Sequence, residues 1–413
     1  MQQALHISIE RCHCYRERNR LILSGSVRIL PLDDALPEGI LHQPDCCYSL
    51  GLVQSEKRQR IVCGMSGGVD SSATAALLRE QGFDVIGITL KLWPQDCVNR
   101  AEDKCCGPQA VTDARTVCHQ LDIPYYLVDE SADFQQHVIR YFADEYKAGR
   151  TPNPCVMCNQ NLKFGRLIDR ADQLGAAYVA TGHFARVERS ADGARYLLKR
   201  GRDLRKDQSY FLFSLRQDQL ARIRFPLGEK TKSDTREVAR QCQLATADKE
   251  ESMEICFVPD NDYGGFLQQA NLVQKHRGDI VDLHGHVLGQ HDGIEFYTIG
   301  QRKGLGLTTP KPVYVLELDA ENNRVVVGDE AALERDEFIA DRCNWHPFEH
   351  LPGPLTVTAK IRYNHPGATA TLTPLDGHRV RVQLHTPARA ITPGQAAVFY
   401  QDDLVVGGGW IVC

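Results

Sequence analysis

Between Arg60 and about Ala185, short apolar runs alternate with longer runs in which apolar residues recur at helical spacing. The short runs are rich in aliphatic and aromatic residues, which favour strands. This alternation predicts a parallel β-sheet flanked by helices. Ligands of such sheets bind beyond the carboxyl ends of the strands. The predicted strands are 61–65, 83–90, 124–128 and 177–180, and the predicted helices are 71–81, 110–121, 131–149 and 162–174.

After Ala185 the pattern changes, because helical runs become rare and strand signals dominate. Asp192-Gly193 predicts the turn of a hairpin, and residues 233–242 predict a helix. The glycine-rich stretch 281–327 predicts short strands, and the alternating residues beyond Pro347 predict a small β-barrel. We therefore expect four parts: an extension at 1–57, an α/β domain at 58–262, a central mostly-β domain at 263–337 and a C-terminal β-barrel at 338–413.

Length and composition agree with a soluble protein of several domains. The chain has 413 residues, of which 42% are hydrophobic and 24% charged, and this length exceeds that of one ordinary core. Its net charge of -5 argues against a protein that grips nucleic acid through bulk positive charge alone. No apolar run approaches membrane-spanning length and no secretory signal is visible, so we expect no membrane association and a cytoplasmic location. Residues 1–57 show no sustained period, which predicts a poorly ordered extension.

The stretch Ser66 to Ser72, SGGVDSS, lies between a predicted strand and a predicted helix. Glycine lets the backbone approach a ligand closely, and the amide groups and dipole of the following helix favour a polyanion. The spacing is neither the dinucleotide fingerprint nor the common P-loop, which ends in Gly-Lys-Ser/Thr. An acidic side chain beside a phosphate site makes sense chiefly as a metal ligand, so Asp70 is a candidate Mg²⁺ ligand. The alternative is a turn in which Asp70 or Ser71 merely caps a helix.

Three cysteines form the second informative group. Cys155 and Cys158 lie in TPNPCVMCN, where Pro152 and Pro154 predict a stiff loop between two helices. Cys256 follows far along the chain in ICF. A Cys-x-x-Cys pair can be a redox dithiol, half of a zinc site or part of an iron–sulfur site, and two buried cysteines can also be incidental. The pattern alone leaves these uses open.

SGGVDSS resembles the pyrophosphate loop of the ATP pyrophosphatases, the PP-loop superfamily, which split ATP into AMP and pyrophosphate to adenylate a substrate oxygen. With the motifs that follow, the chain is similar to the tRNA-specific 2-thiouridylase family over about residues 58–413. The resemblance implies an adenine nucleotide alpha hydrolase-like α/β domain followed by the two β domains. The further motifs are TPNPCVMCN, ATGH at 180–183, KDQSYFL at 206–212, ICF, TIGQRKG at 298–304, IRY at 361–363 and PGQ at 393–395.

The resemblance implies a role for each matching position. Cys158 would be the nucleophile and Cys256 the carrier of a persulfide sulfur, with a disulfide bond as the product of sulfur release. ATP would contact Gly64, Met65, Ser66, Gly67, Gly68, Val69, Asp70, Ser71, Leu90 and Gly182. The target base would lie against Asn153, Pro154 and Cys155, and the tRNA would also contact His183, Lys206, Asp207, Gln208, Arg362, Tyr363 and Gln395.

The implied reaction is ATP-dependent 2-thiolation of the wobble uridine, position 34, in tRNAs for lysine, glutamate and glutamine. Adenylation of the uracil carbonyl makes AMP the leaving group, which explains the ATP site. A persulfide supplies sulfur in nucleophilic form, which explains two thiols far apart in the sequence. The expected cofactors are ATP and Mg²⁺. The expected protein partner is a persulfide-donating sulfur relay protein or a cysteine desulfurase.

Several alternatives stay open. Many relatives carry an acidic residue at the position of Cys155, so Cys155, Cys158 and Cys256 could instead hold a [4Fe–4S] cluster with one open iron. An amide-forming ligase would use the same loop, but nothing resembles a glutaminase domain and the cysteines would have no task. An RNA-binding protein with a zinc-stabilised thiol site would leave the loop around Asp70 unexplained. His183 could be a structural hydrogen-bonding residue rather than a tRNA contact.

Overall fold

The computed structural model describes residues 58–92, 107–250, 255–258 and 262–412, together with four short strands nearer the start of the chain. The chain divides into two compact units, Met1–Glu56 and Lys57–Cys413. In the first unit, β1 (Ile7–Ser8) pairs with β4 (Arg28–Ile29), and β2 (His13–Glu17) pairs with β3 (Arg20–Ser24). The prediction of a poorly ordered extension at 1–57 otherwise lies outside the described residues.

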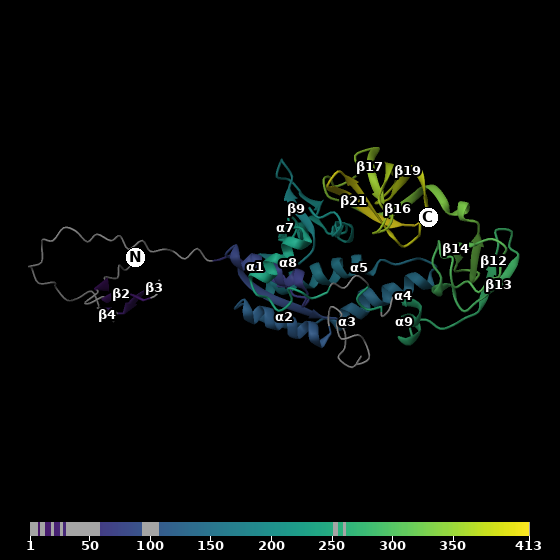
Figure 1. Ribbon diagram of the computed structural model, residues 1–413. Coiled ribbons are helices and arrows are strands. Elements are labelled where there is room, and N and C mark those ends of the chain that lie inside the picture. Colours follow the sequence, from purple (N-terminus) through teal and green to yellow (C-terminus); the bar gives the residue numbers. More distant parts are fainter. Residues whose placement is uncertain are drawn as a thin grey trace, which may run out of the picture. The chain divides into compact units, whose positions relative to one another are not determined.

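The second unit contains the predicted parallel sheet (Figure 1). Its strand order is β11–β8–β5–β6–β7, and all neighbouring strands run parallel. The chain adds strands on one side of β5 and then on the other, so the switch point lies between the carboxyl ends of β5 and β8, where such sheets bind ligands. The strands are β5 (Arg60–Gly64), β6 (Asp84–Lys91), β7 (Tyr125–Asp129), β8 (Tyr178–Ala180) and β11 (Ile223–Arg224).

Helices cover both faces of this sheet because successive residues of a strand point to opposite sides. Ile61 and Cys63 pack with three helices on one face, whereas Val62 packs with Phe164 and Leu167 on the other. The first face carries α1 (Val69–Glu80), α2 (Pro108–Gln120) and α8 (Lys232–Gln241). The second face carries the π-helical segment η2 (Cys158–Arg166) and α6 (Leu167–Gln173).

Between β7 and the cysteines, the predicted helix 131–149 consists of α3 (Ser131–Phe134), the π-helical segment η1 (Gln135–Ile139) and α4 (Arg140–Lys147). The predicted loop at the cysteines is wrong, because α5 (Pro154–Met157) begins there and continues into η2. Pro154 occupies the first helical position, where a missing N–H costs nothing. Asn153 caps this helix by accepting a hydrogen bond from the amide of Val156 at 3.4 Å. A proline that breaks a helix interior is thus compatible with a helix start.

Two β-rich parts follow, as predicted. The central four-stranded sheet has the order β13–β12–β15–β14, with β12 (Gly278–Val281), β13 (Val287–His291), β14 (Tyr314–Asp319) and β15 (Arg324–Gly328). The last part is an eight-stranded sheet in which β16 also pairs with β21, which closes a barrel. Its C-terminal strands are β16 (Glu334–Trp345), β17 (Leu355–Lys360), β18 (Ala368–Pro374), β19 (Val380–Arg389), β20 (Ala396–Gln401) and β21 (Leu404–Ile411).

The predicted hairpin, β9 (Ala185–Arg189) and β10 (Tyr196–Arg200), belongs to the barrel sheet rather than to the parallel sheet. Lys199 of β10 is the register partner of Leu404 in β21. One hydrophobic core accordingly includes Val62 of the parallel sheet and Val398 and Trp410 of the barrel. The remaining short elements are η3 (Ser209–Leu212), α7 (Gln217–Arg222), α9 (Tyr263–Gln269), η5 (Ile294–Phe296) and η6 (Glu330–Leu333).

Within the described ranges, no helix has both the length and the apolar character needed to cross a membrane.

Candidate active site

The loop after β5 has a shape that only glycine permits at one position. Gly67 has a φ of +70°, and a Cβ atom there would lie 2.2 Å from the carbonyl oxygen of Ala110 in α2. Gly68, the residue before α1, provides no side-chain acceptor for the first amide groups of the helix. The loop and the start of α1 therefore present backbone N–H groups and the positive end of a helix dipole, which suit a polyanion.

Serine side chains fix the shape of this loop. Ser71 Oγ accepts a hydrogen bond from the amide of Ser66 at 3.1 Å and donates one to the carbonyl oxygen of Gly68 at 3.1 Å. Ser72 Oγ donates to the same carbonyl oxygen at 2.9 Å. The hydroxyl groups of Ser71 and Ser72 are thus bonded to backbone groups of the loop itself. Backbone N–H groups are therefore the expected binding groups for a ligand.

The loop after β8 lies directly against the start of α1. A Cβ atom on Gly182 would lie 2.8 Å from the carbonyl carbon of Asp70. Gly64 has little more room, since its Cβ atom would lie 3.0 Å from Leu167 Cδ1. Leu90, near the end of β6, packs partly buried against the core. The structure therefore gathers the predicted ATP-binding residues near the switch point, and their contact with ATP stays a prediction.

Asp70, the candidate Mg²⁺ ligand, forms an ion pair with a lysine. Lys232 Nζ, at the start of α8, lies 2.6 Å from Asp70 Oδ1. Lys249 Nζ donates to the carbonyl oxygen of Gly67 at 3.2 Å and to Asp113 Oδ2 at 2.5 Å. Neither lysine is among the site residues predicted from the sequence. The signal that could have found them is the lack of any cationic residue in SGGVDSS, which requires the positive charge to come from elsewhere.

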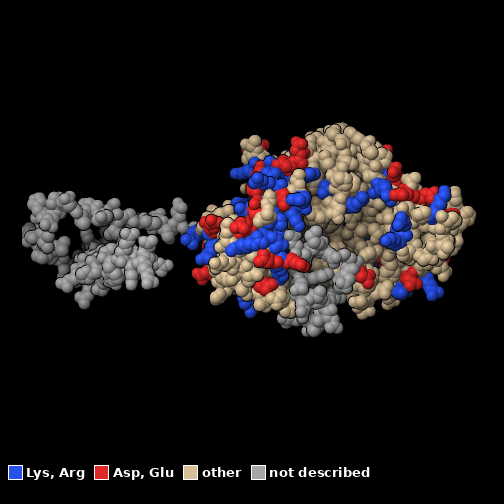
Figure 2. Space-filling view, in the orientation of Figure 1, with Lys and Arg blue, Asp and Glu red and all other residues tan. Residues whose placement is uncertain are grey.

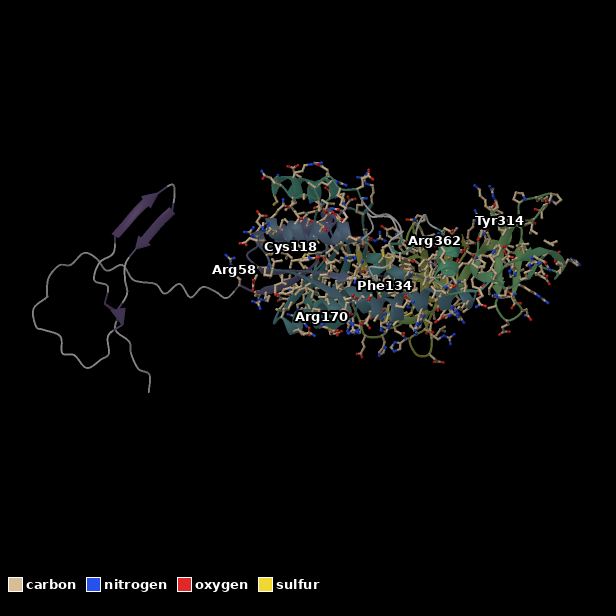
Figure 3. The ribbon with its side chains drawn as sticks, turned by 90° about the horizontal axis from the view of Figure 1, so that it is seen from below. Arg58, Cys118, Phe134, Arg170, Tyr314 and Arg362 are labelled. Carbon is tan, nitrogen blue, oxygen red and sulfur yellow. The ribbon has the colours of Figure 1, made fainter. Side chains whose placement is uncertain are left out.

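Cys158 and Cys256 contribute to one apolar cluster although they are far apart in the sequence. Cys158 is buried in the cluster with Phe134 and Phe142, and Cys256 packs against it. Phe257 anchors the second cysteine, because its ring contacts the rings of Phe134 and Phe142 edge to face, at centroid distances of 5.7 and 5.1 Å. Phe134 is labelled in Figure 3. The structure therefore places the two predicted catalytic cysteines at the same apolar cluster.

Cys155 lies one turn before Cys158 at the start of the same helix and is half-buried. Burial raises the pKa of the Cys155 thiol, and the positive charge of Lys163 opposes this shift. Cys155 does not belong to the apolar cluster of Cys158 and Cys256. Among the cysteines that the structure describes, there is no disulfide bond, so the predicted disulfide stays a proposal about the reaction.

His183 is buried beside Gly182. Its Nδ1 atom lies 2.7 Å from Thr181 Oγ1, and its ring lies 5.7 Å from that of Phe164 and 5.9 Å from that of Phe225. Burial, with a contribution from the charge of Lys163, lowers the pKa of His183 well below its ordinary value. The imidazole is therefore neutral near pH 7. These contacts fit a structural hydrogen-bonding residue, and contact with tRNA stays a prediction.

The KDQSYFL segment is tied to the loop after β8. Asp207 is buried and accepts hydrogen bonds from the amides of Gly201 and Ser209, each at 3.1 Å. Burial raises the pKa of Asp207, and these hydrogen bonds oppose the shift. Gln208 Oε1 accepts a hydrogen bond from the amide of Phe184 at 3.0 Å. Asp207 and Gln208, predicted as tRNA contacts, thus have intramolecular partners, whereas the neighbouring Lys206 is half-exposed.

Two further predicted tRNA contacts lie together on the barrel side. Tyr363 donates from its hydroxyl group to the carbonyl oxygen of Asp207 at 3.3 Å, and its ring lies 4.5 Å from that of Phe211. Arg362, labelled in Figure 3, is exposed and donates to the carbonyl oxygen of Arg389 at 3.2 Å. Tyr363 therefore joins the barrel to the KDQSYFL segment, and Arg362 leaves a cationic group at the surface.

Gln395 joins the barrel to the cysteine-bearing stretch. Its Nε2 atom donates to the carbonyl oxygens of Thr151 and Pro152 at 3.2 and 3.1 Å. The preceding Gly394 packs so tightly that a Cβ atom there would lie 2.8 Å from the carbonyl oxygen of Thr151. The barrel thus helps to position Asn153 and the start of α5.

Charges of both signs are mixed on the face shown in Figure 2. Lys and Arg side chains gather where Figure 1 shows β9, α7 and α8, and acidic side chains lie among them. In this region Arg186 pairs with Asp403 at 2.6 Å and Lys199 with Glu188 at 2.9 Å. This mixture agrees with the net charge of -5, and the described residues on this face do not form a uniformly basic area.

Three family models match in succession along the chain. They are described as the tRNA methyl transferase HUP domain at 59–260, the tRNA methyl transferase PRC-barrel domain at 265–329 and the aminomethyltransferase beta-barrel domain at 335–411. Among solved structures, a 4-thiouridine synthetase–RNA complex with bound ATP is 17% identical with a TM-score of 0.31, and the match covers 52% of this chain and 50% of that one.

Curated relatives match all three parts together. The tRNA-specific 2-thiouridylase MnmA of Heliobacterium modesticaldum is 51% identical over 357 residues, which is 86% of this chain and 93% of the relative. The protein of the same name from Moorella thermoacetica is 52% identical over 348 residues, which is 84% of this chain and 98% of the relative. The matches cover nearly the whole length of these relatives, and about half of the aligned residues are identical. The chain therefore belongs to the tRNA-specific 2-thiouridylase family.

Proposed function

We propose that this protein is a tRNA-uridine 2-sulfurtransferase that uses ATP to replace the C2 oxygen of the wobble uridine with sulfur. One observation supports the mechanism: Cys158 and Cys256 belong to the same apolar cluster, although about a hundred residues separate them in the sequence. A catalytic dithiol accounts for this shared location, since sulfur transfer from a persulfide needs a second thiol to accept the remaining sulfur bond. Membership of the family supports uridine in tRNA as the substrate.

The first step activates the base. The C2 oxygen of uridine attacks the α-phosphorus of ATP, a bond forms between them, and pyrophosphate leaves with the electron pair of the broken P–O bond. The loop from Gly64 to Ser71 binds the phosphates through backbone N–H groups. The uridine loses its N3 proton as the adenylate forms. The wobble base lies in a single-stranded loop, so its removal from the stack costs less than in a duplex.

The second step transfers sulfur. The terminal sulfur of a persulfide on Cys256 attacks C2, and AMP leaves with the electron pair of the C2–O bond. The Cys158 thiolate then attacks Cys256 Sγ, and the electron pair of the broken S–S bond moves to the sulfur on uridine. The products are 2-thiouridine and a Cys158–Cys256 disulfide. A thiol reductant supplies two electrons to restore both thiols. If Cys158 instead attacks Cys256 Sγ before the persulfide reaches C2, the disulfide forms and hydrosulfide is released; the hydrosulfide then attacks C2 and displaces AMP, so the same products form.

The site residues bear differently on two inorganic groups, Mg²⁺ and an iron–sulfur cluster. Asp70 would hold Mg²⁺ through its carboxylate, and the ion would neutralise phosphate charge. A [4Fe–4S] cluster does not fit the described residues, in which no group of three or more His, Cys, Asp or Glu side chains is arranged to hold a metal. The cluster route therefore supplies no step here.

Cys256 can be charged only by a donor that carries persulfide-level sulfur, because sulfide alone cannot convert a thiol into a persulfide without an oxidant. The proposed donor is a persulfide-donating relay protein or a cysteine desulfurase, either of which has the required chemistry. For the tRNA, the exposed Arg362 and the half-exposed Lys206 offer cationic contacts to phosphate. The tRNAs for lysine, glutamate and glutamine are the proposed set.

The function is tested by incubating the protein with ATP, Mg²⁺, a persulfide source and unmodified tRNA, followed by nucleoside digestion and mass spectrometry. The expected products are 2-thiouridine at position 34 and AMP in equal amounts. Protein that is folded and binds ATP but makes no 2-thiouridine would refute the proposal. Iron is measured in anaerobically purified protein in parallel, and thiolation that depends on bound iron would replace the persulfide route with the cluster route.

A further inference from the structure

The SGGVDSS loop supplies no positive charge of its own. In the common P-loop, a lysine within the motif reaches the β- and γ-phosphates. Here the only charged residue of the motif is Asp70, which repels a phosphate unless a cation lies between them. Backbone amides and a helix dipole provide only partial charges. A triphosphate at this loop therefore calls for cationic side chains from other parts of the fold.

Lys232 reaches the loop from the start of α8. Its Nζ atom lies 2.6 Å from Asp70 Oδ1, and its side chain is only 12% exposed. Nζ also lies 5.7 Å from the centre of the Phe184 ring, just after the loop that follows β8. The ammonium group is thus placed between the two loops of the switch point, where the phosphates of a nucleotide are expected.

The start of α8 is held firmly in this position. Thr231 caps the helix, with its side chain accepting a hydrogen bond from the amide of Asp234 while Asp234 accepts one from the amide of Thr231. The amide of Lys232 donates to Asp203 Oδ2 at 3.2 Å. The placement of Lys232 is therefore a feature of the fold rather than of one side-chain rotamer.

Lys249 reaches the same loop at a different residue. Its Nζ atom donates to the carbonyl oxygen of Gly67 at 3.2 Å and to Asp113 Oδ2 at 2.5 Å. Arg236 of α8 fixes this segment by donating to the carbonyl oxygens of Ala247 and Lys249 at 2.9 and 3.1 Å. One helix therefore supports both lysines, and each lysine is oriented by a carboxylate.

We propose that Lys232 and Lys249 bind the phosphate groups of ATP and of the pyrophosphate product at this loop. Asp70 and Asp113 orient the two ammonium groups, and anionic phosphate oxygens are alternative partners of the same chemistry. When a phosphate oxygen takes the place of Asp70 at Lys232, the carboxylate becomes available to Mg²⁺. The inference rests on the proposed use of ATP and assigns the positive charge that the loop lacks.

A purely structural role for the Lys232–Asp70 pair is the competing explanation. Partly buried ion pairs are weak evidence for stability, because the cost of desolvating both charges offsets much of their attraction. The structural role also gives no reason for a second lysine on Gly67 of the same loop. A phosphate-binding role accounts for both lysines at once.

The test compares the affinities of ATP, pyrophosphate and AMP for the full-length wild type, Lys232→Met and Lys249→Met by isothermal titration calorimetry. Loss of one charged hydrogen bond to phosphate should weaken ATP and pyrophosphate about ten- to a hundredfold and leave AMP within about twofold. Lys232→Arg should recover most of the affinity. Lys199→Met is the matched control, because Lys199 also forms a partly buried ion pair, 2.9 Å from Glu188, and should leave all three affinities unchanged.

Two results would overturn the inference: unchanged pyrophosphate affinity in both methionine variants, or an equal loss for AMP. Pyrophosphate is titrated on its own, so the lysines are tested even if ATP is not the substrate. Failure of the wild type to bind ATP would refute the proposed function instead. If a methionine variant does not fold, Asp70→Asn decides the question. This variant should bind metal-free pyrophosphate several-fold more tightly, since it removes both repulsion and competition for Lys232, and unchanged or weaker binding would contradict the inference.

Discussion

Two regions of the site are built in different ways. The nucleotide region, residues 64–72 with 181–183, uses backbone groups and glycines at adjacent strand ends. Its segments pack closely, since a Cβ atom added at Gly182 would lie 2.8 Å from the carbonyl carbon of Asp70. The thiol region, residues 153–158 with 255–258, uses side chains from distant segments that meet because Phe257 is buried with Phe134 and Phe142.

The difference determines which changes each region tolerates. In the nucleotide region, one added methyl group meets backbone atoms that cannot move cheaply, while several side chains only shape the loop. In the thiol region, two sulfur atoms perform the chemistry and the surrounding aromatic residues hold them in place. The nucleotide region should therefore be sensitive to added volume, and the thiol region to lost sulfur.

The largest effect is expected from the sulfur atoms. Cys158→Ser and Cys256→Ser should each lower the rate of 2-thiouridine formation at least about a thousandfold, and the double variant should be no worse, because the two thiols act as one unit. Affinities for ATP and tRNA should stay at the wild-type level. The exposed Cys242 provides the control variant Cys242→Ser, which should be fully active. Substantial activity in Cys256→Ser would remove that residue from the mechanism.

Gly182→Ala tests the sensitivity of the nucleotide region to added volume. The added methyl group would overlap the backbone at Asp70, so ATP affinity measured by calorimetry should fall about a hundredfold, in line with a loss of roughly 3 kcal/mol. Charging of Cys256 with persulfide sulfur, followed by mass spectrometry, should be unaffected. Gly353→Ala is the control, since a Cβ atom at Gly353 meets nothing within 4 Å. Normal ATP affinity in Gly182→Ala would show that ATP binding does not depend on the close packing of Gly182 against Asp70.

The free energy of unfolding should depend on pH, because the protein contains buried histidines. Burial lowers the pKa of His183 well below its ordinary value and lowers that of His346 from 6.5 to about 3. The native imidazoles stay neutral while the unfolded chain takes up protons below pH 6.5, so the free energy of unfolding should fall as the pH drops. His346 alone should account for about 2 kcal/mol between pH 7 and pH 5. Urea unfolding at both pH values measures the loss.

The variant His346→Leu isolates this contribution. Its stability should decline less steeply with pH than that of the wild type, whereas Cys256→Ser should keep the full slope. Burial also lowers the pKa values of His291 and His365, so part of the decline should remain in every variant. Identical slopes for the wild type and His346→Leu would contradict the assignment.

The smallest effect concerns the contact between the barrel and the thiol region. Gln395→Ala removes two hydrogen bonds to Thr151 and Pro152 and should cost about 1 kcal/mol of stability. Because these bonds position the start of α5, thiolation should fall more than ATP affinity does. Gln401→Ala serves as the control, since its side chain bonds at an exposed site, to Thr356 at 3.3 Å. Equal losses of thiolation and ATP binding would mean that the barrel does not act selectively on the thiol region.

The parallel sheet and the loops at its strand ends could be predicted from the sequence, because buried strands and glycine turns leave local patterns. The strand β16 could not, since its first four residues are Glu334, Arg335, Asp336 and Glu337, all exposed. The helix start at Pro154 was missed because the same residue disfavours a helix interior and favours its first position. In each case the local signal was ambiguous.

The residues that contact the site residues could not be predicted from the sequence, for a different reason. Lys232 and Lys249 meet the loop through tertiary packing, and no spacing along the chain encodes it. Motif resemblance selected Asp207 and Gln395, but only the structure supplies their intramolecular hydrogen bonds. Their proposed contact with tRNA remains a prediction.

The hairpin β9–β10 has a consequence for the synthesis of this protein. Its partner strand β21 begins at Leu404, which leaves the ribosome 205 residues after Lys199 (404 − 199). At a synthesis rate of about 5–20 residues per second, the edge of β10 stays without this partner strand for roughly 10–40 s. During this interval an unpaired strand edge is open to pairing with other chains. Production of soluble protein should therefore depend on slow synthesis, low temperature or chaperones more strongly than the stability of the finished molecule suggests.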